Sequence, residues 1–199
     1  MCTWSGSLLL IFCFWYFYYS LQTVLDTGDG QCEKLDISGI QTRLDKEDVE
    51  EMKAVLGRHS SELSSSHALI METKQHLAAA LGRVDGYRLD QLGQQDLQLK
   101  ISISYDLLKV LDVLEPGLSK SRGITLLDLS EVRVRQILRS DLTDRQLVEQ
   151  LGQVEKELSE AHEILRHEDE KAVEGNVAKK ARMDLAEIRK YLQTLKTRY

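Results

Sequence analysis

Apolar side chains recur at three- and four-residue steps through the second half of the chain, which is the spacing of one helix face. One such stripe is formed by Leu147, Leu151, Val154, Leu158, Ala161 and Leu165, and a second by Ala178, Ala181, Leu185, Ile188, Leu192 and Leu195. Gly175 and Asn176 separate the two stripes and predict a turn. The pattern therefore predicts a long antiparallel helical hairpin at the end of the chain.

The same spacing predicts further helices earlier in the chain. Two of them cover about 95–115 and 119–139, and Pro116-Gly117 separates them because the residue before proline resists the helical conformation. Before them, the pattern predicts a short helix at 37–44, a second with an acidic start that runs to about Arg58, and a third at 67–81. Ser64, Ser65 and Ser66 are expected to cap the third helix, and the glycines of 82–93 predict a loop.

About seven helices in successive antiparallel pairs define an all-α fold. Because each pair would cover the apolar face of its neighbour, we expect a tetratricopeptide-like stack that ends in the long hairpin. Two sequence segments are expected: an apolar segment over residues 1–30, and a helical domain over residues 31–199.

The first segment differs from the rest of the chain in charge and in aromatic content. No charged side chain occurs between Met1 and Leu25, and residues 7–25 would form a helix of roughly 28 Å, enough to cross a bilayer. A membrane anchor and a start that is not native to the domain are both consistent with this segment. A cleaved signal peptide fits less well, because a basic n-region and a small-residue cleavage site are missing. The anchor implies a membrane location, and a non-native start implies the cytoplasm or nucleus.

Net charge limits the classes of partner. The formal charge of −6 is unlike that of nucleic-acid-binding proteins, which are normally basic. We therefore expect protein partners, no nucleic acid, and a membrane contact only through residues 7–25. The three cysteines, Cys2, Cys13 and Cys32, are too few for a disulfide framework.

One basic surface stands out on the last predicted helix. Its members are Lys179, Lys180, Arg182, Arg189 and Lys190. This surface could bind an acidic partner, or it could be a solvated helix face whose cations lie toward the negative end of the helix dipole. The preceding helix is acidic, so attraction across the edges of the hairpin would favour the pairing.

The histidines do not form a recognisable metal site. His162 and His167 follow the order of a zinc-protease helix, but they are five residues apart, which places them about 140° apart around the helix. His59, His67 and His76 are spread over two helices with no cysteine nearby. We therefore expect no catalytic residue, no metal and no cofactor in this chain.

The region between the fourth and fifth helices carries a family resemblance. Glu115-Pro116-Gly117, followed by Ser119 and Arg122-Gly123, resembles the C-terminal helical domain of the SMYD family, the SET- and MYND-domain protein-lysine methyltransferases, especially its arthropod branch. Residues 66–82 and 84–87 resemble the preceding helix and loop of that domain in the same order. The resemblance covers about Cys32 to Leu195, and it departs from the family at Ser65, Lys120, Leu127, Asp128 and Ser130.

The resemblance implies a function without catalysis in this chain. The family's zinc finger and SET domain, with its S-adenosylmethionine pocket, have no counterpart here. In the family the helical domain packs against the SET domain, narrows the substrate cleft and can recruit other proteins. We therefore expect a non-catalytic interaction or regulatory domain of a truncated or partial family member. The alternative is a membrane-anchored helical adaptor or tether.

Overall fold

A computed structural model describes residues 33–35, 41–43, 46–59, 63–65, 67–168 and 173–197. The chain forms two compact units, Met1–Asp96 and Leu97–Tyr199. The predicted apolar segment, including residues 7–25 and the boundary after residue 30, lies outside the described residues. None of the described helices is long and apolar enough to cross a membrane.

The first unit contains a short hairpin that the sequence pattern did not predict. Strand β1 (Glu33–Leu35) pairs antiparallel with β2 (Gln41–Arg43), and Lys34 lies opposite Thr42. The helix predicted over 37–44 was therefore wrong. Ile37, Ile40 and Thr42 are β-branched and Gly39 is a poor helix former, so local propensity here favours a strand over a helix.

Two helices follow the hairpin. Helix α2 (Lys46–His59) begins with acidic Glu47 and Asp48, as predicted from the favourable charge at a helix N-terminus. Helix α3 (Ala68–Ala80) packs against α2. The predicted serine cap was wrong, because the imidazole Nδ1 of His67 accepts the N–H of Leu69 at 3.3 Å.

The second unit is built around four long helices, which are α4 (Gln94–Leu114), α5 (Lys120–Leu138), α6 (Asp144–Leu165) and α7 (Val173–Lys196). Ser119 caps α5 by accepting the N–H of Arg122 at 3.2 Å. Thr143 and Gln146 form a reciprocal capping box at the start of α6. Gly117 has φ +108° in the α4–α5 turn, a conformation that residues with a Cβ rarely adopt.

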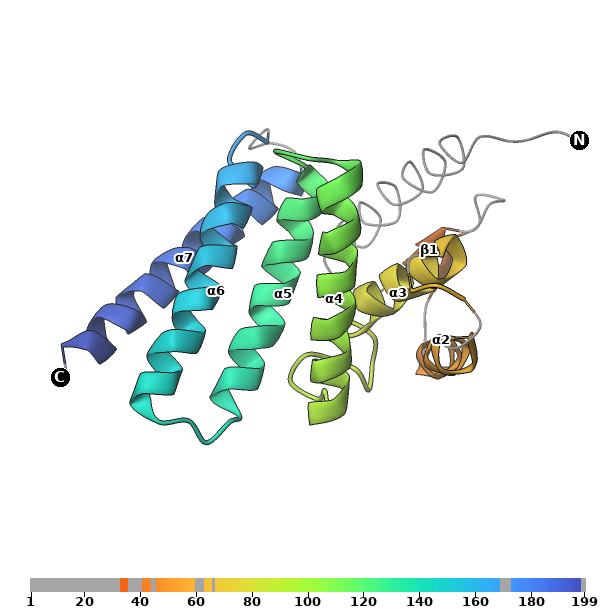
Figure 1. The fold of residues 1–199 in the computed structure, drawn as a ribbon, viewed down its shortest axis with the longest axis horizontal. Helices are drawn as coiled ribbons and strands as arrows, with labels where there is room; N and C mark the ends of the chain where they lie inside the picture. The colour runs from red at the N-terminus through yellow and green to blue at the C-terminus, as the bar shows by residue number, and fades with distance from the viewer. Residues whose placement is uncertain are drawn as a thin grey trace, which may run out of the picture. The chain divides into compact units, whose positions relative to one another are not determined.

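The four helices follow one another in chain order, from green α4 to blue α7 (Figure 1). Contacts between distant residues show that α4 and α5 are antiparallel, because Arg122 meets Asp112 near the turn and Gln136 meets Gln98 at the far end. Helix α6 packs against both α5 and α7. The all-α prediction with antiparallel neighbours is thus confirmed, with six helices in the described residues.

The core follows the predicted stripes closely. In α6 the buried members are Leu151, Val154, Leu158, Ala161 and Leu165, and in α7 they are Ala181, Leu185, Ile188, Leu192 and Leu195. One boundary was wrong, since Gly175 and Asn176 lie inside the first turn of α7 and not between the helices. Gly175 does not interrupt the helix, because it lies in the first turn and the residues after it have good helix propensity.

Candidate interaction surface

The five basic residues predicted to form one surface on α7 divide into two groups. Lys180 pairs with Glu131 of α5 and, at 3.2 Å, with Asp184 one turn further along α7. Arg189 donates from Nε to Glu155 of α6 at 2.8 Å. These two cations therefore join α7 to α5 and α6, and the predicted attraction between α6 and α7 is confirmed at this pair.

The remaining three cations have no ionic partner in the part of the chain that the structure describes. Lys179, Arg182 and Lys190 are all exposed. With about 100° per residue, they lie about 100–180° around the helix from the buried Ala181. They therefore occupy the side of α7 that faces away from its buried stripe.

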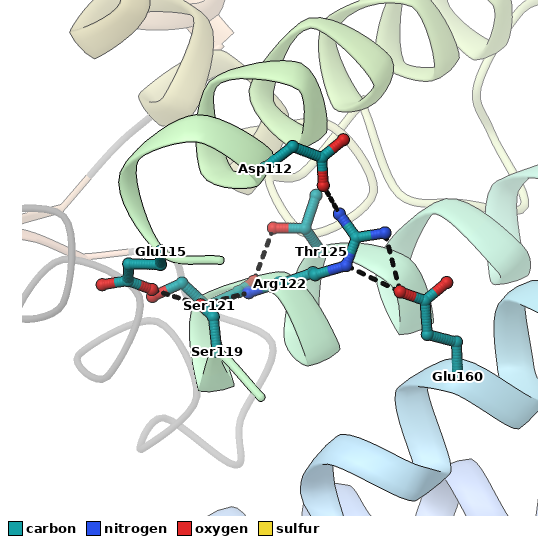
Figure 2. A network of polar contacts seen from close by, with 7 residues as sticks. All are labelled: Asp112, Glu115, Ser119, Ser121, Arg122, Thr125 and Glu160. Atoms are coloured by element: carbon teal, nitrogen blue, oxygen red, sulfur yellow. Dashed lines mark hydrogen bonds and ion pairs between the residues drawn. The ribbon is translucent and has the colours of Figure 1, made fainter. Parts of the chain in front are cut away.

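A second polar arrangement lies around the α4–α5 turn, at the residues that carry the family resemblance. Figure 2 shows the guanidinium of Arg122 between two carboxylates, those of Asp112 on α4 and Glu160 on α6. The Nε and Nη2 atoms of Arg122 both lie 2.7 Å from Glu160 Oε1. One arginine on α5 thus links the helices before and after it.

Ser119 extends this arrangement back into the turn. Its hydroxyl donates to Glu115 while it accepts the backbone N–H of Arg122, as the dashed lines in Figure 2 show. Thr125 donates to the backbone carbonyl of Ser121 at 2.8 Å within the same helix. The hydroxyl of Ser119 therefore links Glu115, directly after α4, to the first turn of α5, which carries Arg122.

A buried carboxylate joins the same three helices one turn away on α6. Glu157 is only 6% exposed, and its Oε1 accepts hydrogen bonds from Tyr105 of α4 at 3.2 Å and Arg133 of α5 at 2.6 Å. A buried carboxylate is costly without such partners. The other oxygen, Oε2, is buried without a partner among the described residues. Glu157 of α6 therefore bonds to both α4 and α5, and these two bonds offset part of the energetic cost of burying its carboxylate.

The tyrosine in this contact has a perturbed pKa. Partial burial raises the pKa of Tyr105 above its usual value of 10.0, and the negative charge of Glu157 raises it further. Arg133 opposes these effects but does not reverse them. The phenol is therefore a donor at neutral pH, which is the form that Glu157 needs as a partner.

Another charged side chain is buried between α4 and α5. Lys100 is 2% exposed and its ammonium lies 2.8 Å from Asp128. Asp128 is one of the positions at which the sequence departs from the SMYD pattern. In this fold its carboxylate serves as the partner of a buried lysine, which is a structural role.

The first unit has its own polar cluster around the 82–93 loop. The Lys53 ammonium lies 2.6 Å from Asp96, 3.2 Å from the hydroxyl of Tyr87 and 4.3 Å from the centre of the Tyr87 ring. The same hydroxyl donates to Glu50. The cluster holds the loop against α2, and Gly82 and Gly86, both at positive φ, allow the loop to turn.

The histidines of the helical region differ in their exposure to solvent. His162 is half-buried with Nδ1 enclosed, His167 is exposed, and His76 is buried in α3. No group of three or more histidine, cysteine, aspartate or glutamate side chains that could hold a metal ion occurs among the described residues.

Sequence reasoning missed the contact of Tyr105 and Arg133 with Glu157, and it missed the pairing of Arg122 with Asp112 and Glu160. A single-helix pattern gives little sign of them, since Tyr105 and Glu157 are 52 positions apart and meet only through tertiary packing. One signal in the sequence was Glu157 itself. It is an acidic residue next to Leu158, which belongs to the most regular apolar stripe, so its carboxylate could be expected near the buried face.

Together these contacts define a helical unit in which charged residues join neighbouring helices, and in which one outer helix face carries cations with no ionic partner among the described residues. No protein-family model, curated protein or solved structure matches the chain.

Proposed function

We propose that this chain is a non-catalytic protein-interaction domain whose binding surface is the outer face of α7. The observation that carries the proposal is the set of Lys179, Arg182 and Lys190, which are exposed together and have no ionic partner among the described residues. The other two cations of the helix, Lys180 and Arg189, are used to hold α7 in place. Three cations on one stripe of a firmly held helix suit the recognition of a charged partner.

We further propose that the domain is a SMYD-like C-terminal helical domain with a tetratricopeptide-like stack. Support comes from the residues of the resemblance, since Glu115, Ser119 and Arg122 interact with one another around the α4–α5 turn. The successive antiparallel helices are also consistent with such a stack. On this proposal the chain contributes docking or gating, and methyl transfer belongs to sequence outside it.

The interaction role can be tested by photo-crosslinking in cells that express the full chain. A photoreactive amino acid replaces Arg182 in one variant and the exposed Lys156 of α6 in a matched control. A discrete covalent adduct at position 182 and none at position 156 is the expected result. If the two positions give the same adducts, or position 182 gives none, the outer face of α7 is not the binding surface.

A membrane-anchored adaptor is the second candidate, and the uncharged stretch from Met1 to Leu25 favours it. Under this alternative the helical body stays an interaction domain and residues 7–25 hold it at a bilayer. Alkaline carbonate treatment of membranes from the same cells separates the two: an anchored chain stays in the pellet, and a peripheral or unbound chain is extracted.

A further inference from the structure

We infer that the outer face of α7 binds an acidic helix of a partner protein. This inference rests on the proposed function and adds the chemistry and shape of the partner. It follows from three features of the surface, which are the spacing of its cations, the residues between them and its position at the end of the helical row.

The cations and the residues between them form one stripe. At 100° per residue, Lys179, Arg182, Met183, Ala186 and Lys190 lie within an arc of about 100° around the helix, which places them on one side of it. Lys179 and Lys190 are eleven residues apart, so the stripe is about 16 Å long between them. We call these five residues the outer stripe.

The middle of the outer stripe is apolar. Ala186 is exposed and small, and the neighbouring Met183 is 61% exposed. A small residue lets a partner backbone approach closely, and an exposed methionine adapts to an apolar side chain. A matching partner therefore carries an apolar residue at its centre and carboxylates on both sides, spread over about three helical turns.

The order of the helices favours a helix as the occupant. Each helix of the row packs against the next, α5 with α6 and α6 with α7 (Figure 1). The outer stripe lies on the side of α7 opposite the stripe that α6 covers, so it is the next packing position in the row. A helix from a partner protein that packed on the outer stripe would therefore continue the row of helices.

Membrane binding fits the same surface less well. A helix that lies in a bilayer interface buries a broad apolar face in the lipid, but the broad apolar face of α7 is already buried in the protein at Ala181, Leu185 and Ile188. Met183 is the single large apolar side chain of the outer stripe. A nucleic acid is disfavoured by the net charge of −6.

The test uses two dye-labelled helical peptides of identical composition and fluorescence anisotropy with the full chain in a non-ionic detergent. In the striped peptide, glutamates flank a central leucine on one helix face, and in the scattered peptide the glutamates are spread around the helix. The striped peptide should bind more tightly by at least about fivefold, because only it can place several carboxylates opposite cations at once. Equal affinities for the two peptides would overturn the inference.

The protein variants use a matched charge change. The triple change Lys179→Glu, Arg182→Glu and Lys190→Glu should weaken binding of the striped peptide by at least about tenfold. The control changes Lys109, Arg145 and Lys156 to glutamate, all exposed, in the same unit as α7 and outside the outer stripe. It alters net charge equally and should change affinity by less than about twofold, since screening confines charge effects to about 10 Å. A control that loses as much affinity as the stripe variant would show that net charge alone is responsible, which contradicts the inference.

Two further measurements cover the remaining outcomes. If the glutamate variant has lost its helical circular-dichroism signal, the glutamine variant at the same three positions replaces it, and it should also bind the striped peptide more weakly. Vesicles containing phosphatidylserine provide a test of membrane binding. If the unchanged chain binds these vesicles but not the striped peptide, and the glutamate variant does not bind the vesicles, the inference is overturned in favour of a membrane. A crosslink at position 182 in cells without a preference for the striped peptide would refute the acidic helix and leave the interaction role standing, whereas failure of both would refute the two proposals together.

Discussion

Replacing Gly123 by alanine should destabilise the second unit, although glycine-to-alanine changes within helices usually stabilise them. Gly123 is the fourth residue of α5, and a Cβ built at this position would lie 2.9 Å from Leu165 Cγ and 3.0 Å from Ile164 Cγ2 of α6. Leu165 is 0% exposed, and its Cγ is a branch point that cannot swing away without moving the rest of the side chain. The two helices therefore pack this closely because residue 123 has no side chain.

Two opposing effects decide the sign. Alanine gains about 0.8–1 kcal/mol over glycine in a helix interior, whereas overpacking a tightly packed core costs about 1–3 kcal/mol. The net effect expected for Gly123→Ala is a loss of roughly 0–2 kcal/mol in the free energy of unfolding. Gly152, inside α6, is the matched control, because a Cβ there would meet nothing within 4 Å. Gly152→Ala should stabilise by about 0.5–1 kcal/mol.

The difference between the two variants is the most informative quantity. Because the propensity gain is common to both, the difference isolates the steric cost and should be about 1–3 kcal/mol. Urea unfolding of the full chain, followed by circular dichroism at the helical minimum, measures both variants under the same conditions. If Gly123→Ala stabilises the protein as much as Gly152→Ala does, then α5 and α6 do not pack closely at this position and the reasoning is refuted.

The remaining predictions concern polar groups. Above about pH 10 the unit should lose stability as Tyr105 ionises, because its raised pKa means that the folded state holds the proton more tightly than the unfolded state; Tyr105→Phe should flatten this part of the curve of unfolding free energy against pH, and an unchanged slope would contradict the assignment. Glu157→Gln should cost about 1–3 kcal/mol in urea unfolding, because Arg133 loses a charge-assisted bond; a neutral or stabilising effect would show that the unpartnered Oε2 outweighs the two bonds at Oε1. Thr143→Ala should cost about 0.5–2 kcal/mol by removing the capping box of α6, with Thr143→Ser as the control that keeps the hydroxyl.

The sequence predicts the helices of the second unit well because their apolar stripes are long. Each of α6 and α7 repeats the pattern over several turns, so an error at one position does not change the element. The errors lie where the pattern is short. Over 37–44 a few apolar residues were consistent with either a helix or a strand, and pairing with Glu33–Leu35 formed β2. At α3 the cap was His67, because the imidazole was placed to accept the N–H of Leu69.

The five cations of the candidate surface were predictable from the sequence, but their division into paired and unpaired residues among the described part of the chain was not. Lys179, Lys180, Arg182, Arg189 and Lys190 could be named from sequence, and nothing in the spacing within α7 says which of them have partners. That depends on register between helices, since Arg189 meets Glu155 and Lys180 meets Glu131 only after α5, α6 and α7 have packed. Periodicity along one helix carries no information about such a register.

The cations of the second unit thus have different structural roles, which depend on whether a carboxylate lies close enough to form an ion pair. Arg122 and Arg133 lie among three helices and are largely buried, with side chains 18% and 14% exposed, so removing either tests folding. Lys180 and Arg189 are half-exposed and hold α7, and each pair contributes only about 0–1 kcal/mol. Lys179, Arg182 and Lys190 contribute no ion pair to the described part of the fold, so changing them should leave stability within about 0.5 kcal/mol. The proposed binding surface on α7 can therefore be changed without altering folding, which is the condition that a surface needs in order to be tested as an interaction site.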